Sequence, residues 1–108
     1  MASDPITTER MEAAMEFLAD SDDVYAQEKM ELERAEICRK RVRARIFQIS
    51  EGTVAERQAS AETSPDTIAE DERYIACVKA FETVRAKRQR AELLIEVWRS
   101  INASQRRA

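Results

Sequence analysis

The sequence has no histidine, one glycine, two prolines and only 6% aromatic residues. The scarcity of glycine and proline leaves few places for loops, and the abundant residues Ala, Glu and Arg favour helices. Without histidine the most common general base is missing, and no glycine-rich phosphate loop or nucleophile motif is present. We therefore expect an all-α protein that is not an enzyme and needs no cofactor.

Cysteine is also rare, with only Cys38 and Cys77. Two cysteines on helical segments without any histidine make a poor metal site, so both are interpreted as small, reduced, buried hydrophobic residues and no metal is expected. No apolar run approaches the ~20 residues that cross a bilayer, and no signal-peptide pattern opens the chain. We expect a cytoplasmic protein without membrane association.

Helix start and stop signals organise the 108 residues into one predicted helical domain. Asp4-Pro5 and Ser64-Pro65 each place a capping residue before a proline, which is typical of a helix N-terminus. Ser21 offers another N-cap, Gly52 a C-cap or kink, and Thr53 opens a capping box. We expect helices over 1–20, 21–50 and 65–103, with a connection over 51–64 that contains a short helix.

Each of the two long predicted helices carries an apolar stripe with heptad-type spacing. The connection is too short for a parallel return, so the fold expected is a long antiparallel, coiled-coil-like hairpin with a shorter N-terminal helix. Matching the stripes places Ala35 opposite Ala91 and Val42 opposite Val84. The stripes are Tyr25, Glu28, Leu32, Ala35, Arg39, Val42, Ile46 and Ile49, and Tyr74, Cys77, Phe81, Val84, Arg88, Ala91, Ile95 and Trp98.

The same register places Arg39 opposite Arg88. Two facing cations in a seam are costly unless carboxylates neutralise them or their side chains reach outward. One interpretation is neutralisation by Glu36, by Glu92 or by a dimer mate. The other is a shared site for an external anion, and both remain open at this point.

Charge is segregated along the chain, with net charges of −8, +5, −5 and +5 over residues 1–33, 34–49, 50–82 and 83–108. In the expected hairpin the two basic segments lie level and form a basic belt that can contact the phosphates of single- or double-stranded DNA. The alternative is a solvated face that meets an acidic helix. The predicted nucleic-acid-binding residues are Arg39, Arg41, Arg43, Arg45, Lys87, Arg88 and Arg90.

The C-terminal part of the last helix has a wider apolar face than a two-helix seam needs. The first helix can cover this face within the chain or across a dimer, and we expect a homo-oligomeric bundle. Trp98 in such a position is more often a core residue than an exposed contact. The predicted oligomer or partner interface consists of Met11, Met15, Leu18, Leu94, Val97, Trp98 and Ile101.

Two stretches, Gly52–Arg57 and Val84–Glu92 continuing to Ile95–Ser100, resemble a group of small, largely uncharacterised helical proteins of tailed bacteriophages and prophages. Those proteins are encoded among early replication and recombination genes. The resemblance covers roughly the second half of the chain. It implies an accessory protein in the host cytoplasm that acts on DNA or on a host or phage DNA-processing complex.

An adaptor or inhibitor of protein–protein type is the alternative function. In that case an acidic surface supplied by residues 9–33 mimics nucleic acid or blocks a basic partner.

Overall fold

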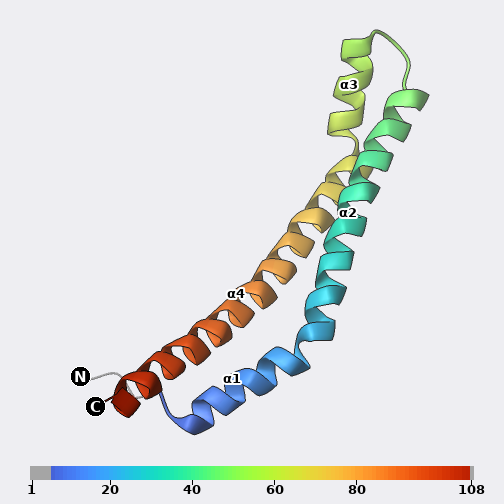
Figure 1. Ribbon diagram of the computed structural model, residues 1–108. Helices are drawn as coiled ribbons and strands as arrows, with labels where there is room; N and C mark the ends of the chain where they lie inside the picture. The colour runs from blue at the N-terminus through green and yellow to red at the C-terminus, as the bar shows by residue number, and fades with distance from the viewer. Residues whose placement is uncertain (1–5, 108) are drawn as a thin grey trace. The chain divides into compact units, whose positions relative to one another are not determined.

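The computed structural model describes residues 6–107, which form four α-helices and no strand (Figure 1). The all-α prediction is confirmed. Within these residues, none of the helices combines the length and the hydropathy needed to cross a membrane. The helices are α1 (Thr8–Asp20), α2 (Asp22–Ile49), α3 (Val54–Thr63) and α4 (Pro65–Arg107).

The helix ends follow the capping chemistry of the sequence in most places. The Oγ1 atom of Thr53 accepts a hydrogen bond from the backbone N–H of Glu56 at 3.2 Å, as the capping box predicts. Gly52 has φ +110°, and a Cβ there would lie 2.6 Å from the Glu56 carboxylate, so the turn needs glycine. Pro65 begins α4 as expected.

Two cap predictions need comment. As predicted, α2 begins directly after Ser21, whose carbonyl accepts from the Tyr25 N–H at 2.9 Å, but the Ser21 hydroxyl donates to the Leu18 carbonyl, and the same residue is the C-cap of α1. The predicted cap at Asp4-Pro5 lies outside the described residues. Thr7 caps α1 by accepting a hydrogen bond from the backbone N–H of Arg10 at 3.2 Å.

The chain divides into two compact units, each of which draws on α2 and α4. Unit 1 contains the chain up to Ala26 and from Glu82 onward, and unit 2 contains Gln27–Phe81. Unit 1 therefore pairs α1 with the later part of α4. Unit 2 pairs most of α2 with α3 and the first part of α4.

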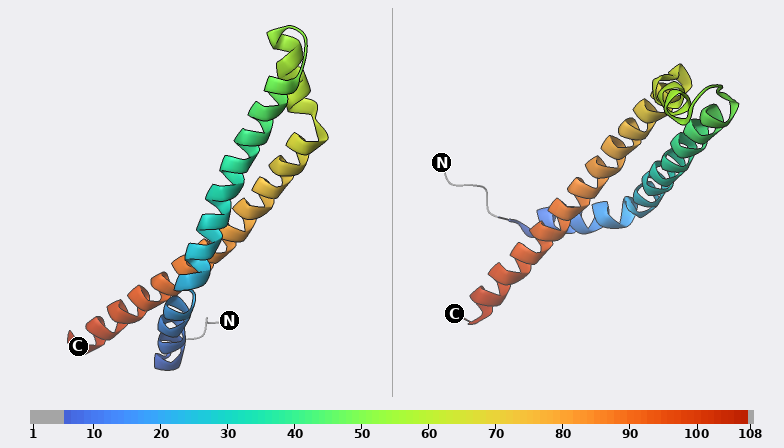
Figure 2. Two further views of the ribbon diagram at one scale, coloured as in Figure 1. Left: turned by 90° about the vertical axis from the view of Figure 1, so that its right-hand side faces the viewer. Right: turned by 90° about the horizontal axis from the view of Figure 1, so that it is seen from above.

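Unit 2 is an antiparallel hairpin, as predicted. Figures 1 and 2 show α2 and the first part of α4 side by side in every view. The Nε atom of Arg39 lies 3.2 Å from Oδ1 of Asp71, and a longer ion pair joins Arg73 to Glu31 at 4.0 Å. The buried residues of this unit are Ala35, Ile46, Ala61, Thr67 and Phe81.

The predicted register is wrong. Arg39 faces Asp71 rather than Arg88, so α2 pairs with an earlier part of α4 than the matched stripes indicated. The reason is that α3 packs against the end of α2, where Arg57 donates to the Phe47 carbonyl at 3.1 Å. The chain therefore already runs back along α2 within α3, before α4 begins.

Unit 1 has a small core made by α1 and α4. Ala14, Ala91 and Ile95 are buried, with Met11, Leu18 and Leu94 packed against them. Part of the predicted interface is therefore used within the chain. Among the other predicted interface residues, Met15, Val97 and Ile101 are exposed and Trp98 is half-buried.

Truncating Phe81 tests the seam of unit 2. Phe81→Ala removes a side chain that is only 8% exposed, and we expect a loss of about 3 kcal/mol in the free energy of unfolding. Ile75→Ala is the matched control, because Ile75 is 57% exposed on the same helix and should change stability by less than about 0.5 kcal/mol. Urea unfolding followed by circular dichroism measures both, and equal losses would contradict the described seam.

Candidate functional site

The predicted nucleic-acid-binding residues fall into two groups that differ in environment. Members of the first group are partly buried and paired with carboxylates, namely Arg39, Arg43 and Arg88. Members of the second group are exposed and form no ion pair within residues 6–107, namely Arg41, Arg45, Lys87 and Arg90.

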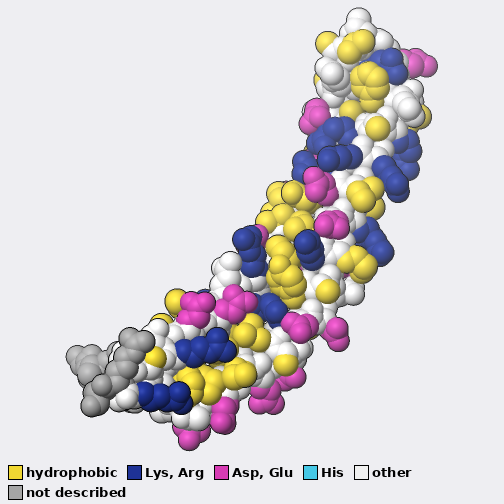
Figure 3. Space-filling model, viewed as in Figure 1, with side chains coloured by type: hydrophobic (Ala, Val, Ile, Leu, Met, Phe, Trp, Pro, Cys, Tyr) yellow, Lys and Arg dark blue, Asp and Glu magenta, His cyan; other side chains and the backbone are white. Residues whose placement is uncertain are grey.

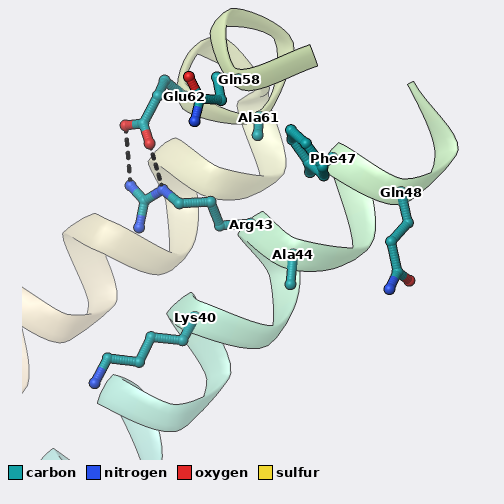
Figure 4. A pocket seen from close by; sticks show the side chains of 8 residues that line it. All are labelled: Lys40, Arg43, Ala44, Phe47, Gln48, Gln58, Ala61 and Glu62. Carbon is teal, nitrogen blue, oxygen red and sulfur yellow. Dashed lines mark hydrogen bonds and ion pairs between the residues drawn. The ribbon is translucent and has the colours of Figure 1, made fainter. Parts of the chain in front are cut away.

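Arg39 and Arg43 share one carboxylate in unit 2. Asp71 lies 3.2 Å from Nε of Arg39 through Oδ1 and 3.1 Å from Nη2 of Arg43 through Oδ2. Arg43 also forms an ion pair of 2.8 Å with Glu62, which Figure 4 shows as two groups pointing toward one another. The Arg39 guanidinium lies 4.5 Å from the ring centroid of Tyr74. These contacts hold both guanidinium groups inside the unit.

Arg88 has an equivalent role in unit 1. Its side chain is 18% exposed, and its Nη2 atom lies 2.8 Å from Oδ1 of Asp22. Nη1 donates to the Leu18 carbonyl at 2.9 Å and to Oγ of Ser21 at 2.8 Å. The guanidinium also lies 5.1 Å from the centre of the Tyr25 ring. Arg88 thus satisfies a carbonyl at the C-terminal end of α1, where a cation is favourable.

The two open interpretations of Arg39 and Arg88 are now decided. Protein carboxylates neutralise both, but the partners are Asp71 and Asp22 instead of the expected Glu36 and Glu92. Spacing within one helix does not identify these partners, because pairing across helices depends on the register.

One sequence signal does mark these partners. The chain has two tyrosines, Tyr25 and Tyr74, and each follows an aspartate by three residues, namely Asp22 and Asp71. Residues three apart lie on one helical face. Each aspartate–tyrosine pair therefore presents a carboxylate and a ring to the same arginine.

The exposed cations of α2 form a row along one edge of the helix. Arg34, Arg41 and Arg45 are spaced by seven and four residues, which places them on one side of α2. Figure 3 shows Lys and Arg side chains following the edge of α2 that is turned away from α4. Arg34 and Arg41 also border a shallow groove with Ile37. We call Arg34, Arg41 and Arg45 the basic row; Arg34 was not among the predicted site residues.

A hollow of about 590 Å³ lies between α2 and α3 (Figure 4). Ala44, Phe47 and Ala61 supply apolar walls. The Arg43 and Glu62 side chains at its edge are paired with each other, and the Lys40 ammonium pairs with Glu36 at 3.3 Å. The charged side chains that line the hollow are therefore already engaged in ion pairs within the chain.

Metal ligands do not gather in the described part of the chain. No group of three or more His, Cys, Asp or Glu side chains there could hold a metal ion. Cys38 and Cys77 are free and only half-buried, so they are more accessible than the buried residues that were predicted.

Neutralising the shared carboxylate tests whether the inner arginines are structural. Asp71→Asn keeps the shape but leaves the charges of Arg39 and Arg43 without their common partner. We expect a loss of about 1–2 kcal/mol in the free energy of unfolding, allowing for solvent screening at side chains that are about one-third exposed. Glu72→Gln is the control, since the exposed Glu72 has no ion pair within residues 6–107. Equal melting curves for the two variants would contradict the structural role.

The basic row offers fixed positive charges at regular intervals on a helix. That arrangement suits a ligand with regularly spaced negative charges.

Comparisons of the chain with protein-family models, with curated proteins and with solved structures found no match, so no relative supplies a function.

Proposed function

We propose that this chain is a non-enzymatic accessory protein that binds the phosphate backbone of nucleic acid through the basic row. The observation that carries the proposal is the division of the arginines. Those in the seams are held by carboxylates, whereas Arg34, Arg41 and Arg45 are exposed and unpaired within residues 6–107. Arginine forms charge-assisted, often bidentate hydrogen bonds with phosphate, so an unpaired row of this kind suits a polyanion.

The spacing of the row supports contact with a continuous backbone. The helical rise puts Arg41 and Arg45 about 6 Å apart along the axis, and Arg34 and Arg41 about 10 Å apart. Phosphates advance by about 3.4 Å per nucleotide along one strand of a duplex, so the row matches a stretch of about five phosphates. The three guanidinium groups can therefore reach different phosphates of the same strand.

The surroundings of the row favour binding without sequence preference. Base stacking needs exposed aromatic rings, and the nearby Phe47 ring is covered by the Arg57 guanidinium at 4.3 Å. The apolar neighbours Met30 and Ile37 are aliphatic, so they offer no ring on which a base can stack. Phosphate contacts give affinity without reading the sequence.

The biological setting that we propose is DNA replication or recombination in a tailed bacteriophage. The support for it is the resemblance of Gly52–Arg57 and of Val84–Ser100 to early phage proteins. On this proposal the protein works in the host cytoplasm and contacts single- or double-stranded DNA.

An adaptor or inhibitor that acts through an acidic surface is the second candidate. Exposed carboxylates on α1 favour it, and Figure 3 shows Asp and Glu side chains along the outer edge of that helix. Such a surface would engage a basic protein and give no affinity for DNA. The exposed carboxylates of α1 are Glu9, Glu12, Glu16 and Asp20.

Salt dependence tests the phosphate contacts directly. Binding of the full chain to a labelled DNA duplex, followed by fluorescence anisotropy, should weaken with salt with a logarithmic slope of about −2.7 for three contacts. That slope corresponds to an affinity loss of about 40-fold between ~50 and ~200 mM salt. Arg41→Gln should weaken binding to any sequence and reduce the slope by about 1.

Two control variants separate this effect from a change in net charge or in folding. Arg99→Gln removes an exposed, unpaired arginine of α4 and should leave the slope unchanged. Arg39→Gln should lower the melting temperature and leave the slope unchanged. Absence of binding at low salt, or an unaltered slope after replacing all three row residues with glutamine, would overturn the proposal.

A further inference from the structure

Three carboxylates follow the exposed side of α1. Ala14 is buried against α4, and Met11 and Leu18 pack on the same core, so these residues mark the inner side of the helix. The helix turns by about 100° per residue, which places the three carboxylates about half a turn away from the inner side. Each is exposed and forms no ion pair within residues 6–107. We call these residues, Glu9, Glu16 and Asp20, the acidic row.

The acidic row of α1 has the same spacing as the basic row of α2. In each row the second charge lies seven residues after the first, and the third lies four residues after the second. The carboxylates and the guanidinium groups therefore follow the same path along their helices, and the rows match in level when the two helices lie parallel. A constant offset of 25 residues then pairs Glu9 with Arg34, Glu16 with Arg41, and Asp20 with Arg45.

A small residue lies between the first and second charge of each row. Ala13 lies four residues after Glu9 and is exposed, and Cys38 lies four residues after Arg34 and is half-buried. The same offset pairs Ala13 with Cys38. Both faces thus advance by four, three and four residues, which is the heptad spacing by which two parallel helices pack. Small side chains at this level let the two helix axes approach each other.

The acidic row of the same chain cannot occupy the basic row in this way. Only Ser21 separates the end of α1 at Asp20 from the start of α2 at Asp22. Arg45 lies further along the unbroken helix α2, about 35 Å from its start by the helical rise. The link through Ser21 spans about 7 Å at most, so Asp20 cannot reach Arg45 of its own chain. The matching row therefore has to come from a second copy.

We propose that the basic row binds the acidic row of a second copy of this chain, with α1 of one copy parallel to α2 of the other. Three pairs of guanidinium and carboxylate groups form across the contact. Exposed ion pairs are individually weak and are screened by salt, so the association is reversible and strongest at low ionic strength. The homo-oligomer expected from the sequence thus uses the exposed charges of α1 and not its core residues Met11 and Leu18.

The contact gives the basic row two competing ligands. Phosphates of nucleic acid and carboxylates of the acidic row accept charge-assisted hydrogen bonds from the same guanidinium groups, and both cannot occupy the row at once. Self-association therefore lowers the number of basic rows open to nucleic acid as the protein concentration rises. This regulatory step rests on the proposed function, whereas the contact between the two rows does not.

Charge reversal at one level tests the contact and its register. Glu16→Lys alone places an ammonium group opposite Arg41, and Arg41→Glu alone places two carboxylates opposite each other. Each single variant should weaken the association by about tenfold or more, because like charges face each other. The double variant Glu16→Lys with Arg41→Glu restores an opposite pair in every contact and should recover the association of the natural chain. Sedimentation equilibrium at low salt measures the association as a mass above the 12.4 kDa of one chain.

The matched control is the double variant Glu16→Lys with Arg34→Glu. It keeps the net charge of the natural chain and contains the same kinds of substitution, but the offset brings like charges together at two levels, so the association should stay weak. Circular dichroism checks that each variant keeps its helicity. A natural chain that stays at the mass of one chain at every concentration, or two double variants that associate equally, rules out the contact.

Competition is measured separately with the labelled DNA duplex. At concentrations where the natural chain self-associates, Glu16→Lys should bind the duplex more tightly than Glu72→Lys, which has the same net charge but lies on α4. Equal affinities rule out the competition. Self-association without affinity for DNA would refute the proposed function and leave the contact standing, and DNA binding by a chain that does not self-associate would do the reverse.

Discussion

The fold depends on arginine side chains held between an aspartate and a tyrosine ring. Arg39 is held by Asp71 and Tyr74 in unit 2, and Arg88 is held in the same way in unit 1. In each case an N–H group of the guanidinium pairs with the carboxylate, and the guanidinium carbon lies over the tyrosine ring. Each of the two units contains one such clamp, which joins helices that are distant in sequence.

These clamps matter because the apolar seams carry little information about register. The buried residues include several alanines, and a stripe that repeats every heptad packs almost as well after a shift of one repeat. A half-buried arginine does not tolerate such a shift, since its charge would lose its partner. The ion pairs therefore select one register among several that the apolar contacts alone would allow.

The ion pairs also divide the cations into two groups, those held in the seams by carboxylates and those that stay exposed. The segment 34–45 of α2 contains six cations, but the helical period turns Arg39 and Arg43 inward and the basic row outward. Unit 1 shows a comparable separation between Arg88 in its seam and Lys87 at its exposed edge. A cluster of cations in the sequence thus divides into a part that holds the fold and a part that stays exposed and unpaired within residues 6–107.

Much of the architecture could be predicted from the sequence by itself. The spacing of apolar residues determined which positions are buried, such as Ala35, Ile46 and Phe81, and the capping residues determined where helices begin. The exposure of Arg41 and Arg45 follows from the same period. These features are local, because they depend on residues within a few turns of one helix.

The register and the ion pairs were decided only by the tertiary structure. Because α3 packs against the end of α2, α4 pairs with α2 in a different register from the one that the apolar stripes predict. The spacing of residues within one helix carries no information on such a contact between separate helices. Asp71 became the partner of Arg39 for that reason, although the two residues are 32 positions apart. A carboxylate neutralises whichever cation the packing brings to it, so the division of the arginines into held and free groups is a tertiary property.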